Sequence, residues 1–155
     1  MSEKEFTPVA AGWVACDGRY LKEILRLNGR VFYLYEGPEG FGIASLIDGD
    51  LRFSTPLPER DLIDAARDLA AIADANPFNK LMAVGMDLER HGVFPDLALD
   101  ISTDRVSLRL RRFSWSVKGR KFVEYYAEVD TLGVTLNDVE FRLLFPALAR
   151  ALGAR

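Results

Sequence analysis

Three Asx-Gly dipeptides divide the first third of the chain and constrain its fold more than any other feature. They are Asp17-Gly18, Asn28-Gly29 and Asp48-Gly49, and each suits the positive φ angles of a two-residue hairpin turn. The apolar or β-rich runs around them are Val9–Cys16, Arg19–Leu27, Arg30–Glu36, Phe41–Ile47 and Asp50–Thr55. An antiparallel meander of five strands accounts for all three turns. The spacing of Tyr20–Leu27 also suits a short helix, but the Asn-Gly turn after it favours a strand.

The rest of the chain predicts one helix, a second group of strands and a final helix. Glu59–Ala75 has apolar residues at helical spacing, and Asn76-Pro77 is expected to end it. The second group of strands is expected at Leu81–Leu88, Leu97–Ser102, Arg105–Val117 and Arg120–Asp130. Thr135-Leu136-Asn137-Asp138 resembles a capping box that opens a helix to about Leu152, with Pro146 kinking or splitting that helix. We therefore expect an α+β fold in which an antiparallel sheet of about nine strands carries two main helices.

Length and composition limit the class of protein to which the chain can belong. The chain has 155 residues, of which 49% are hydrophobic and 28% charged, and this length predicts a single domain over residues 1–155. It contains no apolar run of about 18 residues, and its first residues lack the apolar core of a signal peptide. One cysteine, Cys16, cannot form an intramolecular disulfide. We therefore expect a cytoplasmic protein. No motif of a known family is present, and no cofactor is expected.

One segment separates positive charge from an otherwise acidic chain. Residues 105–123 contain seven Lys and Arg and no Asp or Glu, whereas the whole chain has a formal net charge of −3. Phe113, Trp115 and Phe122 lie among these cations. Because a local field attracts partners more than net charge does, this segment is the first candidate for a binding surface.

The segment reads as a β-hairpin whose turn defines the pairing of its two strands. A two-residue turn at Lys118-Gly119 sets Trp115 opposite Phe122, Phe113 opposite Glu124, Arg111 opposite Tyr126 and Arg109 opposite Glu128. Leu108, Leu110, Ala127 and Val129 then face the core near the base, while the aromatic side chains gather on the other face near the tip. A bulge at Arg111-Arg112 would instead return Phe113 and Trp115 to the core face, and the sequence leaves both registers open.

These patterns predict a non-enzymatic domain that binds another macromolecule. The preferred function is a protein-interaction or chaperone-like adaptor, expected to be a homodimer, because aromatic residues and arginine are enriched at protein interfaces. The predicted partner-binding residues are Arg111, Phe113, Trp115, Arg120, Lys121, Phe122 and Tyr126. The same residues could instead bind nucleic acid, by stacking on bases and neutralising phosphates.

A third alternative is a small-ligand or metal-dependent enzyme. If residues 87–91 are extended, Asp87, Glu89 and His91 share one face and offer ligands suited to a divalent ion.

Two further features are interpreted as structural and not as functional sites. A Cys16–His91 nucleophilic pair has no supporting motif, and the glycine-rich stretch 37–42 is expected to be a hairpin loop, because a strand follows it where a phosphate cradle would need a helix.

Overall fold

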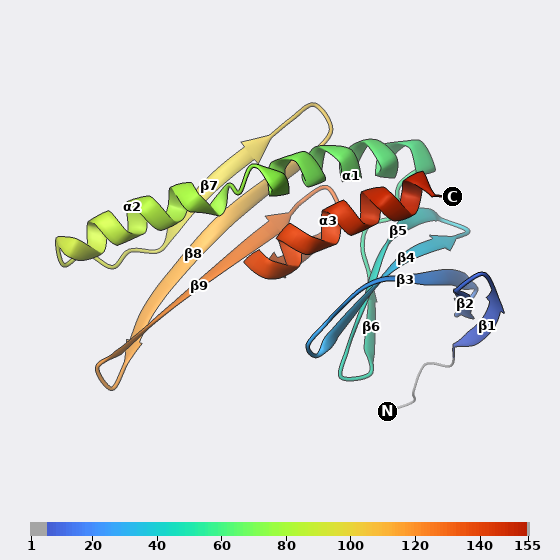
Figure 1. Ribbon diagram of the computed structural model, residues 1–155, viewed down its shortest axis with the longest axis horizontal. Coiled ribbons are helices and arrows are strands. Elements are labelled where there is room, and N and C mark those ends of the chain that lie inside the picture. The colour runs from blue at the N-terminus through green and yellow to red at the C-terminus, as the bar shows by residue number, and fades with distance from the viewer. Residues whose placement is uncertain (1–5, 155) are drawn as a thin grey trace.

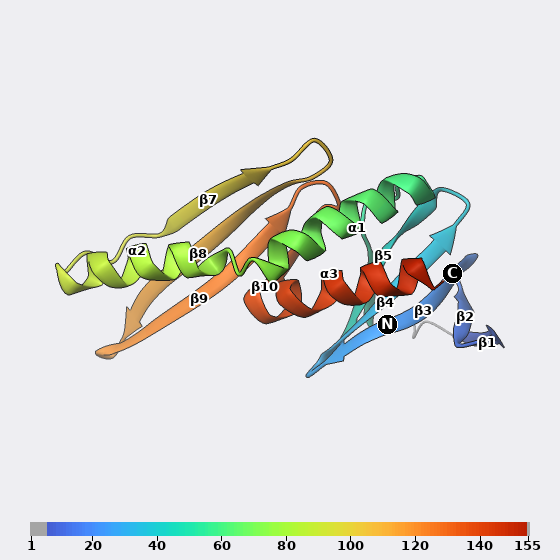
Figure 2. The ribbon, with the colours of Figure 1, turned by 45° about the horizontal axis from the view of Figure 1, so that its top comes forward.

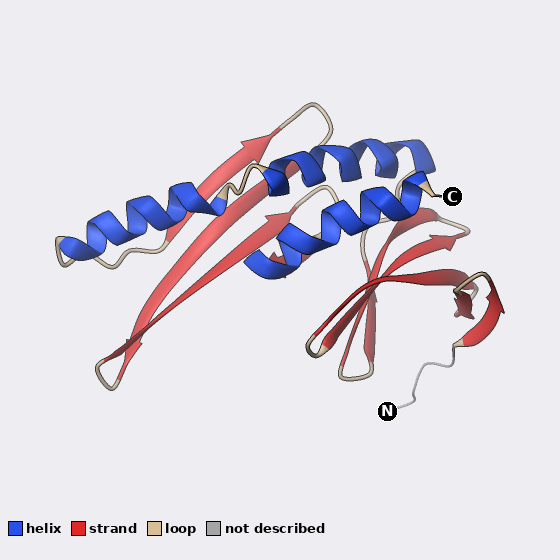
Figure 3. Ribbon diagram, viewed as in Figure 1, coloured by secondary structure: helices blue, strands red, loops and turns tan. Residues whose placement is uncertain are grey.

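The α+β class is confirmed in the computed structural model, which describes residues 6–154. The strands form two antiparallel sheets, and three helices accompany them (Figures 1 and 3). The first sheet is a meander of six strands in sequence order, and the second has four strands in the order β10-β9-β8-β7. Residues 6–154 thus contain ten strands and three helices, where about nine and two were expected for the chain.

The first sheet follows its turn signals. Its strands are β1 (Thr7–Ala10), β2 (Trp13–Cys16), β3 (Arg19–Leu27), β4 (Arg30–Gly37), β5 (Gly40–Ile47) and β6 (Asp50–Phe53). Tyr20–Leu27 lies in β3, so the strand interpretation is confirmed. The expected single strand over Val9–Cys16 is wrong: the backbone reverses at Ala11 and Gly12, whose φ angles are 51° and 84°. The glycine-rich stretch is a tight hairpin between β4 and β5, as expected.

The helices are α1 (Glu59–Asp74), α2 (Phe78–Arg90) and α3 (Asp138–Gly153). The expected strand over Leu81–Leu88 is wrong, because this segment lies inside α2. Asn76, with a φ of 51°, separates α1 from α2, so the Asn-Pro pair joins two helices. The buried residues of α2 are Phe78, Leu81 and Gly85, and this spacing of three and four residues is that of a helix.

The second sheet consists of β7 (Leu97–Ser102), β8 (Ser107–Val117), β9 (Arg120–Val129) and β10 (Val134–Asn137). Strand β10 was not expected, and it contains Thr135, the residue predicted to cap the last helix. The cap is Asn137 instead: its side chain accepts a hydrogen bond from the Glu140 amide, and the Glu140 carboxylate accepts one from the Asn137 amide. Helix α3 continues through Pro146 as one element.

The helices lie on one side of both sheets (Figure 2). The main core joins Phe32, Leu34 and Ile43 of the first sheet to the helices and to the second sheet, whose buried residues include Leu108 and Leu110. A smaller cluster containing Tyr33, Tyr35 and Cys16 covers the other face of the first sheet. No such cluster of described residues covers the opposite face of the second sheet.

Candidate binding surface on the second sheet

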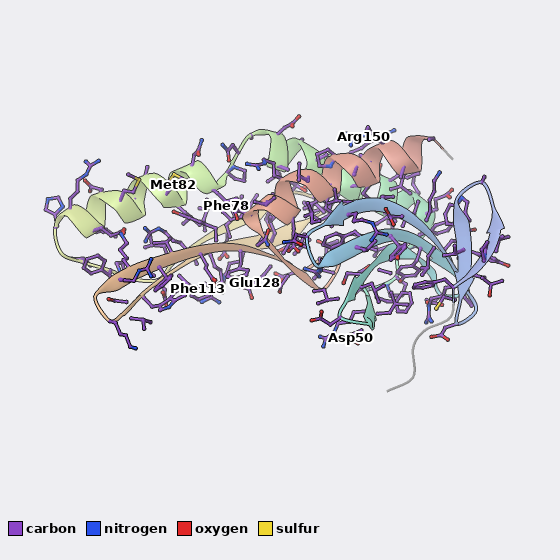
Figure 4. The ribbon with its side chains drawn as sticks, turned by 60° about the horizontal axis from the view of Figure 1, so that its bottom comes forward. Asp50, Phe78, Met82, Phe113, Glu128 and Arg150 are labelled. Carbon is purple, nitrogen blue, oxygen red and sulfur yellow. The ribbon has the colours of Figure 1, made fainter. Side chains whose placement is uncertain are left out.

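The second sheet presents one face to the helices and one to solvent. Strands β8 and β9 pair without a shift from Leu108–Val129 to Val117–Arg120, so the predicted register is confirmed and the bulge at Arg111-Arg112 is absent. Alternation then places Leu108, Leu110 and Arg112 toward the helices, where all three are buried. The face turned away from the helices is called the open face below. Figure 4 shows Phe113 and Glu128 on this side of the ribbon, away from Phe78 of α2.

Four aromatic rings form two contacting pairs on the open face. Trp115 and Phe122 stack with their ring centroids 5.6 Å apart and an interplanar angle of 17°. Phe113 and Tyr126 meet edge to face at 5.9 Å. Trp115 and Phe122 are each 40% exposed. Because the two pairs follow one another along β8 and β9, they form an apolar row in solvent.

Carboxylates bind the arginines and one of the rings on the open face. Arg109 binds Asp100 of β7 through Nε at 2.6 Å, and this hydrogen bond lowers the pKa of Asp100. Arg111 donates to Glu128 at 3.3 Å, although Arg109 is the residue that lies opposite Glu128 in the strand register, as predicted. The Tyr126 hydroxyl donates to Glu124 at 2.6 Å, which raises the pKa of Tyr126. The open face therefore carries acidic as well as basic groups.

Most of the basic segment is neutralised within the chain. Arg105 lies within 4 Å of Asp64 and Asp68 of α1, and Arg109 and Arg111 have the partners given above. Arg112 and Lys121 share Glu89 of α2. Within residues 6–154, only Lys118 and Arg120 of the seven cations have no acidic partner within 4 Å.

The structure brings six of the seven predicted partner-binding residues to the open face. These are Arg111, Phe113, Trp115, Arg120, Phe122 and Tyr126. Lys121 does not join them, because it pairs with Ser116 on the face toward α2. There its ammonium group binds Glu89 and lies 5.6 Å from the centroid of the Phe94 ring. Its role is therefore to hold α2 against the hairpin.

A buried ion pair anchors α2 on β8. Arg112 is 2% exposed, and its Nη2 donates to Glu89 at 2.8 Å while its Nε donates to the Tyr125 hydroxyl at 3.1 Å. Gly85 provides the space for this guanidinium, since a Cβ atom there would lie 2.4 Å from the Arg112 Cζ. The helix thus covers the hairpin through a charged contact as well as through Phe78, whose ring meets that of Tyr125 edge to face at 6.0 Å.

The proposed metal ligands are not arranged as a site. Asp87 and Glu89 lie in the last turns of α2 and His91 caps it, so the segment is helical and the extended backbone that this alternative requires is not present. Glu89 turns to Arg112 and Lys121, whereas the His91 ring bonds to the Asp87 carbonyl at 2.9 Å. Among the described residues, no group of three or more His, Cys, Asp or Glu side chains could hold a metal ion.

A cleft of about 410 Å³ lies where β10 and α3 meet the first sheet. Its apolar lining includes Phe32, Ile43 and Leu144. Arg30, one of its polar groups, already donates to Glu140 and to Ser45. Among the described residues, no His, Cys, Asp or Glu lines the cleft, so its serine and threonine hydroxyls have no imidazole or carboxylate base within the lining.

Sequence reasoning placed Glu124 and Glu128 on the open face through the hairpin register, and the structure confirms that placement. It did not include them in the predicted binding surface, although they balance the arginines there. It missed Asp100 altogether, because no motif marks this residue and it comes from β7.

Comparison with known proteins identifies no relative of the chain. No protein-family model matches the chain, and no curated protein or solved structure is significantly similar to it. Within the described residues, no helix is both long and apolar enough to span a bilayer.

Proposed function

We propose that the chain is a non-enzymatic protein-interaction domain, a chaperone-like adaptor of the cytoplasm that also self-associates. The observation that carries this proposal is the row of aromatic rings on an uncovered sheet face. Trp115 and Phe122 are each 40% exposed although they stack on one another. Large apolar side chains grouped in solvent and bordered by charge are typical of an interaction site.

The charge pattern favours a protein partner over nucleic acid. A nucleic-acid surface needs cations that are free to neutralise phosphates, whereas Arg109 and Arg111 are bound to Asp100 and Glu128. Mixed charge around an aromatic centre instead suits a protein surface, where paired charges fix orientation.

The test compares Trp115→Ala with Val139→Ala. Val139 is also 40% exposed, but it lies on α3, outside the open face. A photo-crosslinking residue at position 115 or 139 first identifies proteins that contact each position in cells, and the candidate partner is then purified. We expect Trp115→Ala to weaken its binding by about 30-fold, the effect of losing an interface hot spot. Equal affinities for the two variants would contradict the proposal.

Fluorescence anisotropy with labelled single-stranded and duplex oligonucleotides tests the nucleic-acid alternative. The informative variant is Lys118→Glu/Arg120→Glu, because it alters the two cations without a described acidic partner and leaves the Glu89 cluster intact. We expect the protein to show no salt-sensitive binding to either oligonucleotide. Salt-sensitive binding that this variant abolishes would replace the proposed function with a nucleic-acid arm.

A further inference from the structure

The outer half of β9 is an unpaired sheet edge. Strand β10 pairs with residues 126–129 of β9 only, so residues 120–125 have β8 on one side and no described strand on the other. This part of the hairpin lies at the end of the molecule away from the first sheet (Figures 1 and 2). It contains no proline and no bulge, the devices that commonly protect such an edge.

The backbone groups on this edge can be assigned. The Asp130 amide donates to the carbonyl of Ser107, the first residue of β8. The Gly133 amide donates to the carbonyl of Val129 from the side of β10. Because backbone groups alternate along an antiparallel strand, even-numbered residues of β9 bond toward β8 and odd-numbered residues point the other way. Lys121, Val123 and Tyr125 therefore direct their N–H and C=O groups to the open edge.

We propose that a second copy of this chain pairs antiparallel with that edge, with Phe122 opposite the partner's Phe122 on the two-fold axis. In this register Lys121 exchanges backbone hydrogen bonds with the partner's Val123, and the reciprocal pair does the same. Arg120 then faces the partner's Glu124, also twice. Both residues are exposed, and neither has an ion-pair partner among residues 6–154.

The neighbouring registers fit less well. Hydrogen bonding requires that outward-pointing residues face one another, so the symmetric registers centre on single residues. Centring on Lys121 sets two ammonium groups against each other, and centring on Glu124 does the same with two carboxylates. Centring on Val123 places Glu124 opposite Phe122. Only the Phe122 centre sets opposite charges directly across the two strands, which stabilises such a pair.

The pairing would also enlarge the open face. Phe122 already stacks on Trp115, so apposition of the two Phe122 rings would join two such stacks across the axis. This inference rests on the proposed function in naming a protein as partner, and deepens it by identifying one partner as a second copy. Variants of Arg120 and Glu124 test the edge, and a variant of Trp115 tests the open face.

The test measures the oligomeric state of the full chain by sedimentation equilibrium, for the native sequence and for variants that reverse the charge at position 120, at position 124 or at both. We expect a dimer for the native sequence. Arg120→Glu alone and Glu124→Arg alone each place like charges across the axis twice, and should weaken the dimer by about tenfold or more. The double variant Arg120→Glu/Glu124→Arg restores opposite charges and should restore the dimer. Circular dichroism checks that each variant is folded.

Cysteine crosslinking reports the register directly. Under mild oxidation, Phe122→Cys should crosslink two chains, because opposite residues at a non-hydrogen-bonded position lie about 4.5–5.5 Å apart between Cβ atoms. Val117→Cys is the control, since Val117 is 49% exposed and shares that face. Native Cys16 is buried and is retained.

A monomer at about 100 µM protein without a Phe122→Cys crosslink would overturn the inference, as would a dimer that neither single exchange weakens. A monomer that still loses its partner through Trp115→Ala would refute this inference and the proposed self-association, and leave the proposed binding of a partner protein intact. A dimer with the expected crosslink and rescue, whose Trp115→Ala variant binds partners normally, would refute the function and support the pairing.

Discussion

Replacing Glu89 by Gln should destabilise the protein strongly, because Glu89 neutralises a buried arginine. Its side chain is 9% exposed, and that of Arg112 is 2% exposed. Lys121, the second cation on this carboxylate, is 44% exposed and can turn to solvent. The amide of Gln retains a hydrogen-bond acceptor but no charge, so Arg112 would remain buried without a counterion.

The expected loss of stability is about 3 kcal/mol, the lower end of the range for removing one member of a buried ion pair. A chain of this size typically has about 5–15 kcal/mol in total, so the variant stays folded but loses a large fraction of its stability. The same loss corresponds to a decrease in Tm of roughly 6–12 °C. Covering of the hairpin by α2 should weaken first, because Glu89 lies in the last turns of that helix.

Urea unfolding followed by far-UV circular dichroism measures this effect, with the slope m expected to stay constant. The matched control is Asp100→Asn, which removes the carboxylate of another arginine pair made by the same strand. That pair is on the surface, with Arg109 49% and Asp100 70% exposed, so its loss should change the midpoint little. A Glu89→Gln midpoint equal to that of Asp100→Asn would refute the reasoning.

Two further predictions concern the last helix and the open face. Asn137→Ala should cost about 1 kcal/mol in thermal unfolding, because it removes the cap of α3, while Asn137→Asp retains an acceptor and should cost less; equal losses would contradict the capping role. The hydrogen bond to Glu124 raises the pKa of Tyr126 above its ordinary value of 10.0, so the neutral phenol stabilises the fold below that pH, and this contribution is lost as pH rises through the folded pKa. Absorbance titration at 295 nm should therefore show a high-pH component that Tyr126→Phe reduces, the rest coming from Tyr33 and Tyr35, whose pKa values are raised by burial; an unchanged upper part of the curve would disprove the shift.

Short-range signals were sufficient for the strand pairs that tight turns connect. The Asn28-Gly29 and Asp48-Gly49 turns bring together residues that are neighbours in sequence, so β3–β4 and β5–β6 follow from local backbone preference. The turn at Lys118-Gly119 likewise predicted the β8–β9 hairpin, but the structure was needed to exclude the bulge at Arg111-Arg112. The same signals missed β10 and the reversal between β1 and β2.

The helix α2 could not be predicted in the same way. Its segment Leu81–Leu88 is apolar with no clear period, a pattern that suits a strand or a helix. Packing decides between them, because the helix buries Phe78, Leu81 and Gly85. Gly85 appears unfavourable for a helix in sequence, and its use becomes evident only beside the Arg112 guanidinium.

The basic segment shows most clearly what the sequence determines and what only tertiary packing determines. The sequence alone predicted that residues 105–123 belong to a hairpin, because a tight turn is a local property. It left open which side chains share a face, and the structure decided this by showing no bulge at Arg111-Arg112. The sequence showed no counterions within the segment. Those come from Asp64, Glu89 and Asp100, which belong to three other elements. Only tertiary packing brings these carboxylates within reach of the arginines, since ion pairing acts over a few ångströms in space regardless of separation along the chain.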